Sequence, residues 1–268
     1  MSSPGTAERE IKLSHGRSRY LEAGEGPPVV LLHGVGFVEG RDNWRLNIGP
    51  LSSRFRVLAP DLLGWGAGDQ LNVGYSFAYL VDFVREFQDA LDIRSSHVVG
   101  HSMGGWIASL LAYESPQRVD KLVLVASGGL ATRPLSTMTT WQPPTEDFIR
   151  ERLEKVSKAH PDPERAIRER LGLAQDPERT ARFGRIMEHM SNPETRQRYN
   201  TTRRLPFISS PTLVVWGRQD EVNPLPMGED TQRLIPNSRL EILEDCGHSI
   251  PVERADEFNR IVLDFLSE

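Results

Sequence analysis

The chain has 268 residues, somewhat less than two domains at about 150 residues each. A hydrophobic fraction of 38% together with 22 glycines is ordinary for a globular protein and excludes wholesale disorder. The formal net charge of −5 argues against nucleic-acid binding, because a phosphate backbone requires a basic surface. No stretch approaches the roughly 18 unbroken apolar residues of a membrane helix, so we expect neither nucleic acid nor membrane as a partner.

Short apolar runs alternate with amphipathic segments, which is typical of a mostly parallel α/β sheet flanked by helices. The runs expected to be strands are 29–32, 56–58, 97–99, 121–125, 212–216 and 239–242. Ser76 is expected to cap a helix that carries Leu80, Val84, Phe87 and Leu91 on one face. A closing helix presents an apolar stripe of Phe258, Ile261, Val262 and Phe265.

The alternation stops between Gly128 and about Ser210, where the sequence is charged and without strand-like runs. Helices are expected there over 148–156 and 177–190. The simplest explanation is an insertion between two strands of one sheet. We therefore predict a core made of residues 1–127 and 211–268, with residues 128–210 as a helical cap.

The residues up to Ile11 are polar and lack a charged-then-apolar leader, and Cys246 is the single cysteine. A lone cysteine cannot form a disulfide within the chain and fits a reducing compartment. We expect a cytoplasmic protein. Its oligomeric state stays open, and a homo-oligomer is compatible with the sequence.

The pentapeptide from Gly100 to Gly104 has Ser102 at its centre and lies between an expected strand and an expected helix. A serine on such a sharp turn has its hydroxyl pushed outward, and flanking glycines leave room for close packing. This context indicates a nucleophile rather than an ordinary glycine-rich turn. A serine hydroxyl also needs a base to take its proton.

Among seven histidines, His248 is the expected base, because its loop follows the carboxyl end of the last strand. Asp220, just past the strand ending at Trp216, is the expected acid, with the adjacent Glu221 as an alternative. Backbone N–H groups of Met103 and of Val35 are the expected oxyanion donors. Neither a dinucleotide loop nor a metal motif fits the spacings, so we expect no cofactor and no metal.

These motifs, with Asp61 through Gly64, Gly66 and Gly247, make the chain resemble an α/β-hydrolase over essentially its whole length. Within that superfamily it resembles the meta-cleavage-product hydrolases, which cut carbon–carbon bonds in ring-fission products of aromatic degradation. The similarity is densest in 47–50, 102–105, 128–130, 222–224 and 255–259, which are mostly framework positions.

The resemblance implies a small-molecule substrate, a vinylogous diketone, cleaved by a Ser-His-Asp triad. It implies substrate contacts from Gly34, from Asn43 near the oxyanion turn, and from Arg185 in the cap, whose guanidinium suits a carboxylate. Asn43 could equally be a loop-turn residue, and Arg185 could lie on a solvated helix face.

The chain also departs from the family, which commonly has a bulky aromatic where Ser249 follows His248. The alternative function is therefore a carboxylesterase or lactonase that uses the same triad. A third interpretation is a non-catalytic ligand receptor that is built on a hydrolase scaffold. The intact triad argues against it.

Overall fold

The computed structural model describes residues 5–14, 16–37, 40–66, 69, 75–132, 141–156 and 162–268. Within these ranges the strands form one eight-stranded sheet in the order β1-β2-β4-β3-β5-β6-β7-β8. The strands are β1 (Ala7–Leu13), β2 (Gly16–Ala23), β3 (Pro28–Leu32), β4 (Arg56–Pro60), β5 (Ser96–His101), β6 (Val119–Val125), β7 (Thr212–Gly217) and β8 (Ser238–Leu243). Strands β1 and β2 pair antiparallel with each other, and β2 pairs antiparallel with β4, whereas the remaining pairs are parallel.

The six predicted strands are confirmed as β3 to β8. The β1–β2 hairpin was not predicted. Its strands expose charged side chains between buried ones, so they lack the continuous apolar run by which the inner strands are recognised.

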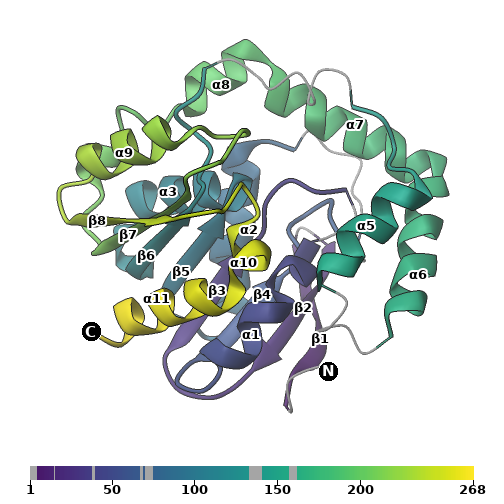
Figure 1. Ribbon diagram of the computed structural model, residues 1–268, viewed down its shortest axis with the longest axis horizontal. Helices are drawn as coiled ribbons and strands as arrows, with labels where there is room; N and C mark the ends of the chain where they lie inside the picture. Colours follow the sequence, from purple (N-terminus) through teal and green to yellow (C-terminus); the bar gives the residue numbers. More distant parts are fainter. Residues whose placement is uncertain are drawn as a thin grey trace.

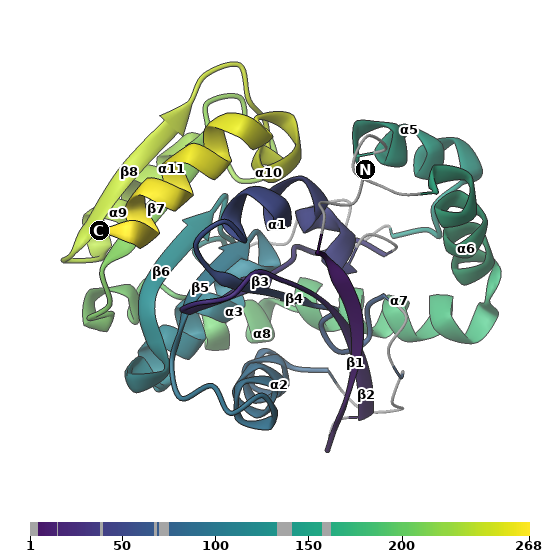
Figure 2. The ribbon, with the colours of Figure 1, turned by 90° about the horizontal axis from the view of Figure 1, so that it is seen from below.

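Helices cover both faces of the sheet, as Figure 2 shows. Helices α1 (Arg45–Leu51) and α11 (Ala255–Ser267) lie on one face, and α2 (Phe77–Ala90) and α3 (Met103–Glu114) lie on the other. Successive residues of β3 serve the two layers, because side chains alternate along a strand: Val29 and Leu31 pack with the α1 layer, Val30 and Leu32 with the α3 layer. The remaining helices outside residues 128–210 are η1 (Gly40–Trp44), η2 (Pro116–Arg118), α9 (Leu225–Leu234) and α10 (Ile250–Glu253).

Helix α2 starts where the sequence predicts. The Ser76 hydroxyl accepts a hydrogen bond from the backbone N–H of Tyr79 at 3.1 Å, and this satisfies one of the first amides of the helix. Among the described residues, no helix is both long and apolar enough to cross a membrane.

The described residues between β6 and β7 are helical, with α5 (Glu146–Val156), α6 (Pro163–Gln175), α7 (Pro177–Ser191), α8 (Pro193–Tyr199) and η4 (Leu205–Phe207). Figure 1 shows α5 to α8 as an arc around one side and the top of the sheet. The helices predicted over 148–156 and 177–190 are confirmed as α5 and α7. The division into core and cap stays a prediction; we call residues 128–210 the cap segment.

Two buried arginines tie the cap segment to loops of the sheet. Arg170 of α6 contacts Asp42 in η1, with 2.5 Å between Nη2 and Oδ2. Arg179 of α7 donates to the backbone carbonyl of Gly66. Because Asp42 precedes Asn43, the α6 contact also fixes η1 beside the predicted oxyanion turn.

Candidate active site

Ser102 lies on the turn between β5 and α3 with φ of 53° and ψ of −113°. A positive φ is rare for a residue with a Cβ atom and costs about 1–3 kcal/mol unless the surroundings enforce it. Here the Ser102 N–H donates to the Val125 carbonyl at 2.9 Å, and its carbonyl accepts from the N–H of Gly128 at 2.9 Å and of Trp106 at 3.1 Å. These bonds to β6 and α3 fix the strained turn.

The glycines around Ser102 allow its turn to pack against neighbouring backbone. A Cβ atom on Gly104 would lie 2.1 Å from the carbonyl oxygen of Leu32, and one on Gly100 would lie 2.4 Å from the carbonyl oxygen of Gly104. Both distances are far below the van der Waals contact distance of a Cβ atom and an oxygen. The sequence pattern therefore reflects a steric requirement of the crossing between β3, β5 and α3.

Gly104→Ala is expected to lower the free energy of unfolding by about 3 kcal/mol or more, because the added methyl group meets immobile backbone. Gly172→Ala is the matched control: nothing lies within 4 Å of its Cβ position in α6, so the same change should stabilise by about 0.5–1 kcal/mol. Urea denaturation of both variants checks this. A Gly104→Ala protein as stable as the wild type would contradict the steric argument.

The structure brings Ser102, His248 and Asp220 together from three separate loops. The Ser102 hydroxyl lies 3.0 Å from His248 Nε2, and His248 Nδ1 lies 2.8 Å from Asp220 Oδ2. Because a carboxylate only accepts, the neutral imidazole carries its proton on Nδ1 and presents the Nε2 lone pair to the serine hydroxyl. This arrangement allows His248 to take the serine proton.

Asp220 is fixed independently of the histidine. Its side chain is fully buried, and Oδ1 accepts hydrogen bonds from the backbone N–H groups of Val222 and Asn223, each at 2.8 Å. The neighbouring Glu221 is exposed, and the described contacts of His248 Nδ1 are with Asp220. Of the two carboxylates considered from sequence, Asp220 therefore has the geometry of the acid.

The turn after β3, which carries the expected oxyanion donor Val35, packs against Ser102. His33 is fully buried; its Nε2 accepts the Leu62 N–H at 2.9 Å, and its Nδ1 donates to the Gly34 carbonyl at 2.8 Å. Gly34 approaches so closely that a Cβ atom there would lie 3.1 Å from Ser102 Cβ. Met103 begins α3, so its N–H is one of the first amides of that helix, which have no acceptor within it.

Ser102 and His248 line a cavity of about 620 Å³. Val35, Met103, Gly34 and Asn43 line it as well, so four further predicted site residues gather around the serine. Most of the remaining wall is apolar or aromatic and includes Phe37, Trp106, Trp141, Phe183, Met187 and Met190. Such a wall suits a substrate with a large apolar group.

Arg185 is not among the described residues that line this cavity, and its role in substrate binding stays a prediction. It is exposed on α7, whereas Phe183, Ile186, Met187 and Met190 form the buried stripe of that helix. A residue one position before Ile186 is turned by about 100° from this stripe and faces outward. The lining contains Arg196 of α8 instead.

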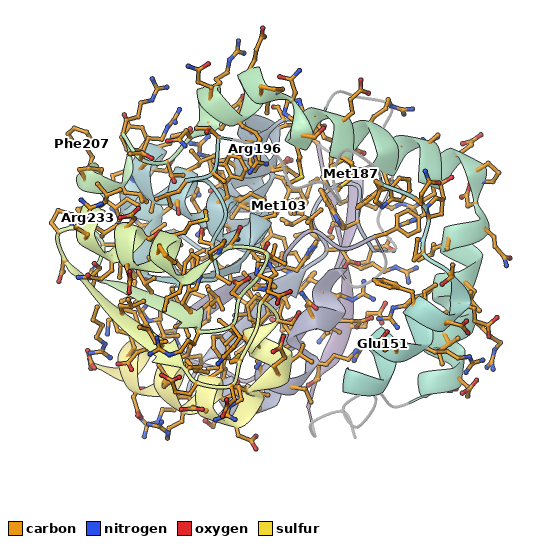
Figure 3. The ribbon with its side chains drawn as sticks, turned by 45° about the horizontal axis from the view of Figure 1, so that its top comes forward. Met103, Glu151, Met187, Arg196, Phe207 and Arg233 are labelled. Atoms are coloured by element: carbon orange, nitrogen blue, oxygen red, sulfur yellow. The ribbon has the colours of Figure 1, made fainter. Side chains whose placement is uncertain are left out.

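Arg196 is 4% exposed, and among the described lining residues it is the one with a permanent charge. Its guanidinium lies 5.2 Å from the ring centre of Trp106 and donates to the carbonyls of Ala131 at 3.2 Å and Met190 at 3.0 Å. Desolvation lowers the pKa of Arg196. In Figure 3, Arg196 and Met187 extend from α8 and α7 toward the core, on the side of Met103. The segment PETRQRY lacks an apolar stripe, so no periodicity could have pointed to this residue.

Cys246 is not a competing nucleophile. It is 1% exposed, and burial, with a smaller contribution from Glu253, raises the pKa of its thiol to about 12. A thiol of this acidity is protonated near neutral pH, and the thiolate is the reactive form. The described residues bring together no three His, Cys, Asp or Glu side chains as a group that could hold a metal ion.

Comparison with known proteins agrees with this architecture. A family model described as the alpha/beta hydrolase fold matches residues 27–255. The chain is 31% identical over 273 residues to a 2-hydroxy-6-oxo-6-phenylhexa-2,4-dienoate hydrolase of Comamonas testosteroni, covering 97% of this chain and 94% of that protein.

Two solved structures illustrate the range of similar proteins. A meta-cleavage product hydrolase from Pseudomonas fluorescens is 30% identical with a TM-score of 0.80, covering 97% of each chain. A membrane phospholipase A described as a bacterial virulence factor is 29% identical with a TM-score of 0.81, covering 98% of this chain and 86% of that one. The predicted fold class is confirmed, and the named relatives are hydrolases. This chain is a hydrolase that belongs to the α/β-hydrolase family.

Proposed function

We propose that this enzyme hydrolyses a carbon–carbon bond in a vinylogous diketone, a ring-fission product of aromatic degradation, with Ser102 as nucleophile. The observation that carries the proposal is the continuous hydrogen-bonded series from Ser102 through His248 to Asp220, which opens into a cavity with an apolar wall and one buried guanidinium. The names of the similar dienoate and meta-cleavage product hydrolases supply the substrate class.

The reaction begins when a proton moves from the dienol hydroxyl to carbon 5, with His248 as the shuttle, and leaves an isolated ketone at carbon 6. Ser102 Oγ then attacks that ketone while His248 Nε2 takes the hydroxyl proton. Backbone N–H groups of Val35 and Met103 stabilise the oxyanion. Collapse breaks the bond between carbons 5 and 6, and the electron pair enters the conjugated dienolate. His248 protonates this product, and water activated by the same base frees the acid from Ser102.

Arg196 is the group proposed to hold the carboxylate of the dienoate. A buried guanidinium gains from an anionic ligand, because the pair offsets part of the desolvation that lowers the pKa of this arginine. Its two bonds to backbone carbonyls fix its direction, and its position over Trp106 places it near the start of α3, which carries Ser102 at its N-terminus.

Arg196→Gln is expected to raise KM for an acidic dienoate about 10- to 100-fold, which corresponds to the loss of a charge-assisted bond of about 1.5–3 kcal/mol. Neutral esters should be nearly unaffected. Arg185→Gln, which removes an exposed arginine outside the described lining of the cavity, is the matched control. It should leave KM unchanged for both the acidic dienoate and the neutral esters. Steady-state kinetics on both substrate types measures this. An equal rise in KM for neutral esters would remove Arg196 from carboxylate binding.

A carboxylesterase or lactonase is the second candidate, and two observations favour it. Ser249 lines the cavity where the family commonly has a bulky aromatic, and the fold is equally similar to the phospholipase structure. The same serine and histidine would act on an ester carbonyl.

One substrate panel separates the two functions: a coloured ring-fission dienoate, p-nitrophenyl esters and lactones, each with wild type and Ser102→Ala. Rapid bleaching of the dienoate with slow ester turnover supports carbon–carbon cleavage. Fast ester or lactone turnover with an untouched dienoate overturns it in favour of the second candidate. Every activity should disappear in Ser102→Ala.

A further inference from the structure

We propose that Glu253 and His101 are positioning residues for His248, acting through the backbone of residues 246–249, which we call the base loop. The inference rests on the proposed function, because it assumes that His248 is the base for Ser102. Neither side chain contacts the reacting hydroxyl in the described hydrogen bonds. Each instead holds a peptide group that determines where the imidazole lies.

Glu253 holds the base loop on both sides of the histidine. From the end of α10 its carboxylate reaches back, and Oε2 accepts the Gly247 N–H at 2.7 Å while Oε1 accepts the Ser249 N–H at 2.9 Å. One carboxylate thus holds the backbone N–H groups of the two residues that flank His248. Hydrogen bonds to a charged acceptor are roughly twice as strong as neutral ones, so this contact constrains the loop more than an ordinary turn would.

His101 holds the carbonyl of His248, which belongs to the same peptide group as the Ser249 N–H. Its ring is 5% exposed, and Nε2 lies 2.9 Å from the carbonyl oxygen of His248. Because a carbonyl oxygen only accepts, His101 Nε2 carries the proton and donates it. His101 directly precedes Ser102, so this bond joins the nucleophile turn to the base loop independently of the bond between Ser102 and His248.

The residue before the acid Asp220 is also hydrogen-bonded to the base loop. The Gln219 N–H donates to the Cys246 carbonyl at 2.9 Å, and Gln219 Oε1 accepts the Cys246 N–H at 2.9 Å. Gln219 directly precedes Asp220. The residues next to the nucleophile and next to the acid therefore both bind the backbone of the base loop, which places the His248 ring between its two partners before any substrate arrives.

The consequence is a specific kinetic effect. A displacement of a catalytic group by about 1 Å can cost on the order of 100-fold in rate. Among the described residues, His101 lines the cavity and Glu253 does not, so the loss of Glu253 leaves the cavity wall unchanged. Loss of either Glu253 or His101 should therefore slow proton removal from Ser102, and loss of Glu253 should do so without weakening ligand binding. Glu253→Gln is suited to this test, because its amide can accept only one of the two N–H groups and turns its own donors toward the other.

The test is phosphonylation of Ser102 by a p-nitrophenyl alkylphosphonate, which reports activation of the serine whatever the natural substrate. Glu253→Gln and His101→Phe should lower the limiting rate of phosphonylation about 10- to 100-fold, and in Glu253→Gln the half-saturating reagent concentration should be unchanged. His101→Gln keeps an N–H donor near the Nε2 position and should recover a rate within about threefold of wild type. Glu257→Gln alters a carboxylate that pairs with Arg254 and is the unaffected control.

The downfield proton NMR signal of His248 Nδ1–H should shift or broaden in Glu253→Gln and His101→Phe, but not in Glu257→Gln. Thermal unfolding separates these effects from loss of fold, and if His101→Phe does not fold, Glu253→Gln at its exposed position decides the outcome. Wild-type rates in a folded Glu253→Gln, or a failure of His101→Gln to recover, would overturn the inference alone. A wild-type enzyme that is not phosphonylated at Ser102 would overturn the proposed function, and the positioning role with it.

Discussion

Ser102→Ala is expected to lower kcat by about 10⁴- to 10⁶-fold on any substrate that the enzyme turns over, because among the described hydroxyls that line the cavity it is the Ser102 hydroxyl that is hydrogen-bonded to His248 Nε2. The serine is 8% exposed and contributes its backbone, not its hydroxyl, to the bonds that fix the turn. Substrate binding should therefore persist, and single-turnover kinetics should show an unchanged dissociation constant.

The matched control is Ser109→Ala in the same helix region. Ser109 is also buried, but its hydroxyl donates to the Gly105 carbonyl at 2.8 Å and it does not line the cavity. This variant should retain full activity. Comparable activity in Ser102→Ala and Ser109→Ala would show that the hydroxyl of Ser102 takes no part in the reaction.

Asp220→Asn is expected to lower kcat by about 10⁴-fold near neutral pH while leaving the fold intact. The backbone N–H groups of Val222 and Asn223 both point at Oδ1, so the new amide must turn its oxygen toward them. Its NH₂ group then faces His248 Nδ1 and donates to it. The neutral imidazole is forced to carry its proton on Nε2, where it can no longer accept the serine proton.

Glu221→Gln tests the alternative assignment of the acid. The residue is adjacent in sequence but exposed, so its substitution should change kcat less than about twofold. Steady-state rates of the two variants at the same pH make the comparison. A large loss in Glu221→Gln together with an active Asp220→Asn would contradict the geometry of this site.

The parts of the fold that could be predicted are those in which burial requires a continuous run of apolar residues in the sequence. Strand β7 is buried along its whole length and was found, whereas β1 alternates exposed charges with buried residues at a sheet edge and was not. The turn carrying Ser102 was predictable because Gly100 and Gly104 satisfy a steric requirement that no other residue meets.

The substrate contacts of the cap segment were less predictable, because they depend on how helices pack on the sheet. The resemblance implied a substrate contact from Arg185, although the stripe of Phe183, Ile186 and Met187 turns this residue outward. Arg196 carries no such signal, because its position depends on packing against Trp106 and on the carbonyl of Ala131, which is distant in sequence. The contacts of Glu253 and His101 with the base loop likewise depend on backbone atoms, which a residue pattern does not report.

The most direct measurement is mass analysis of the enzyme quenched with acid during turnover of a dienoate or an activated ester. The peptide containing Ser102 is expected to gain the mass of the acyl half of the substrate, and this adduct should disappear in Ser102→Ala. Turnover with no adduct at any time, or an adduct on another residue such as Cys246, would contradict the role of Ser102 as the nucleophile.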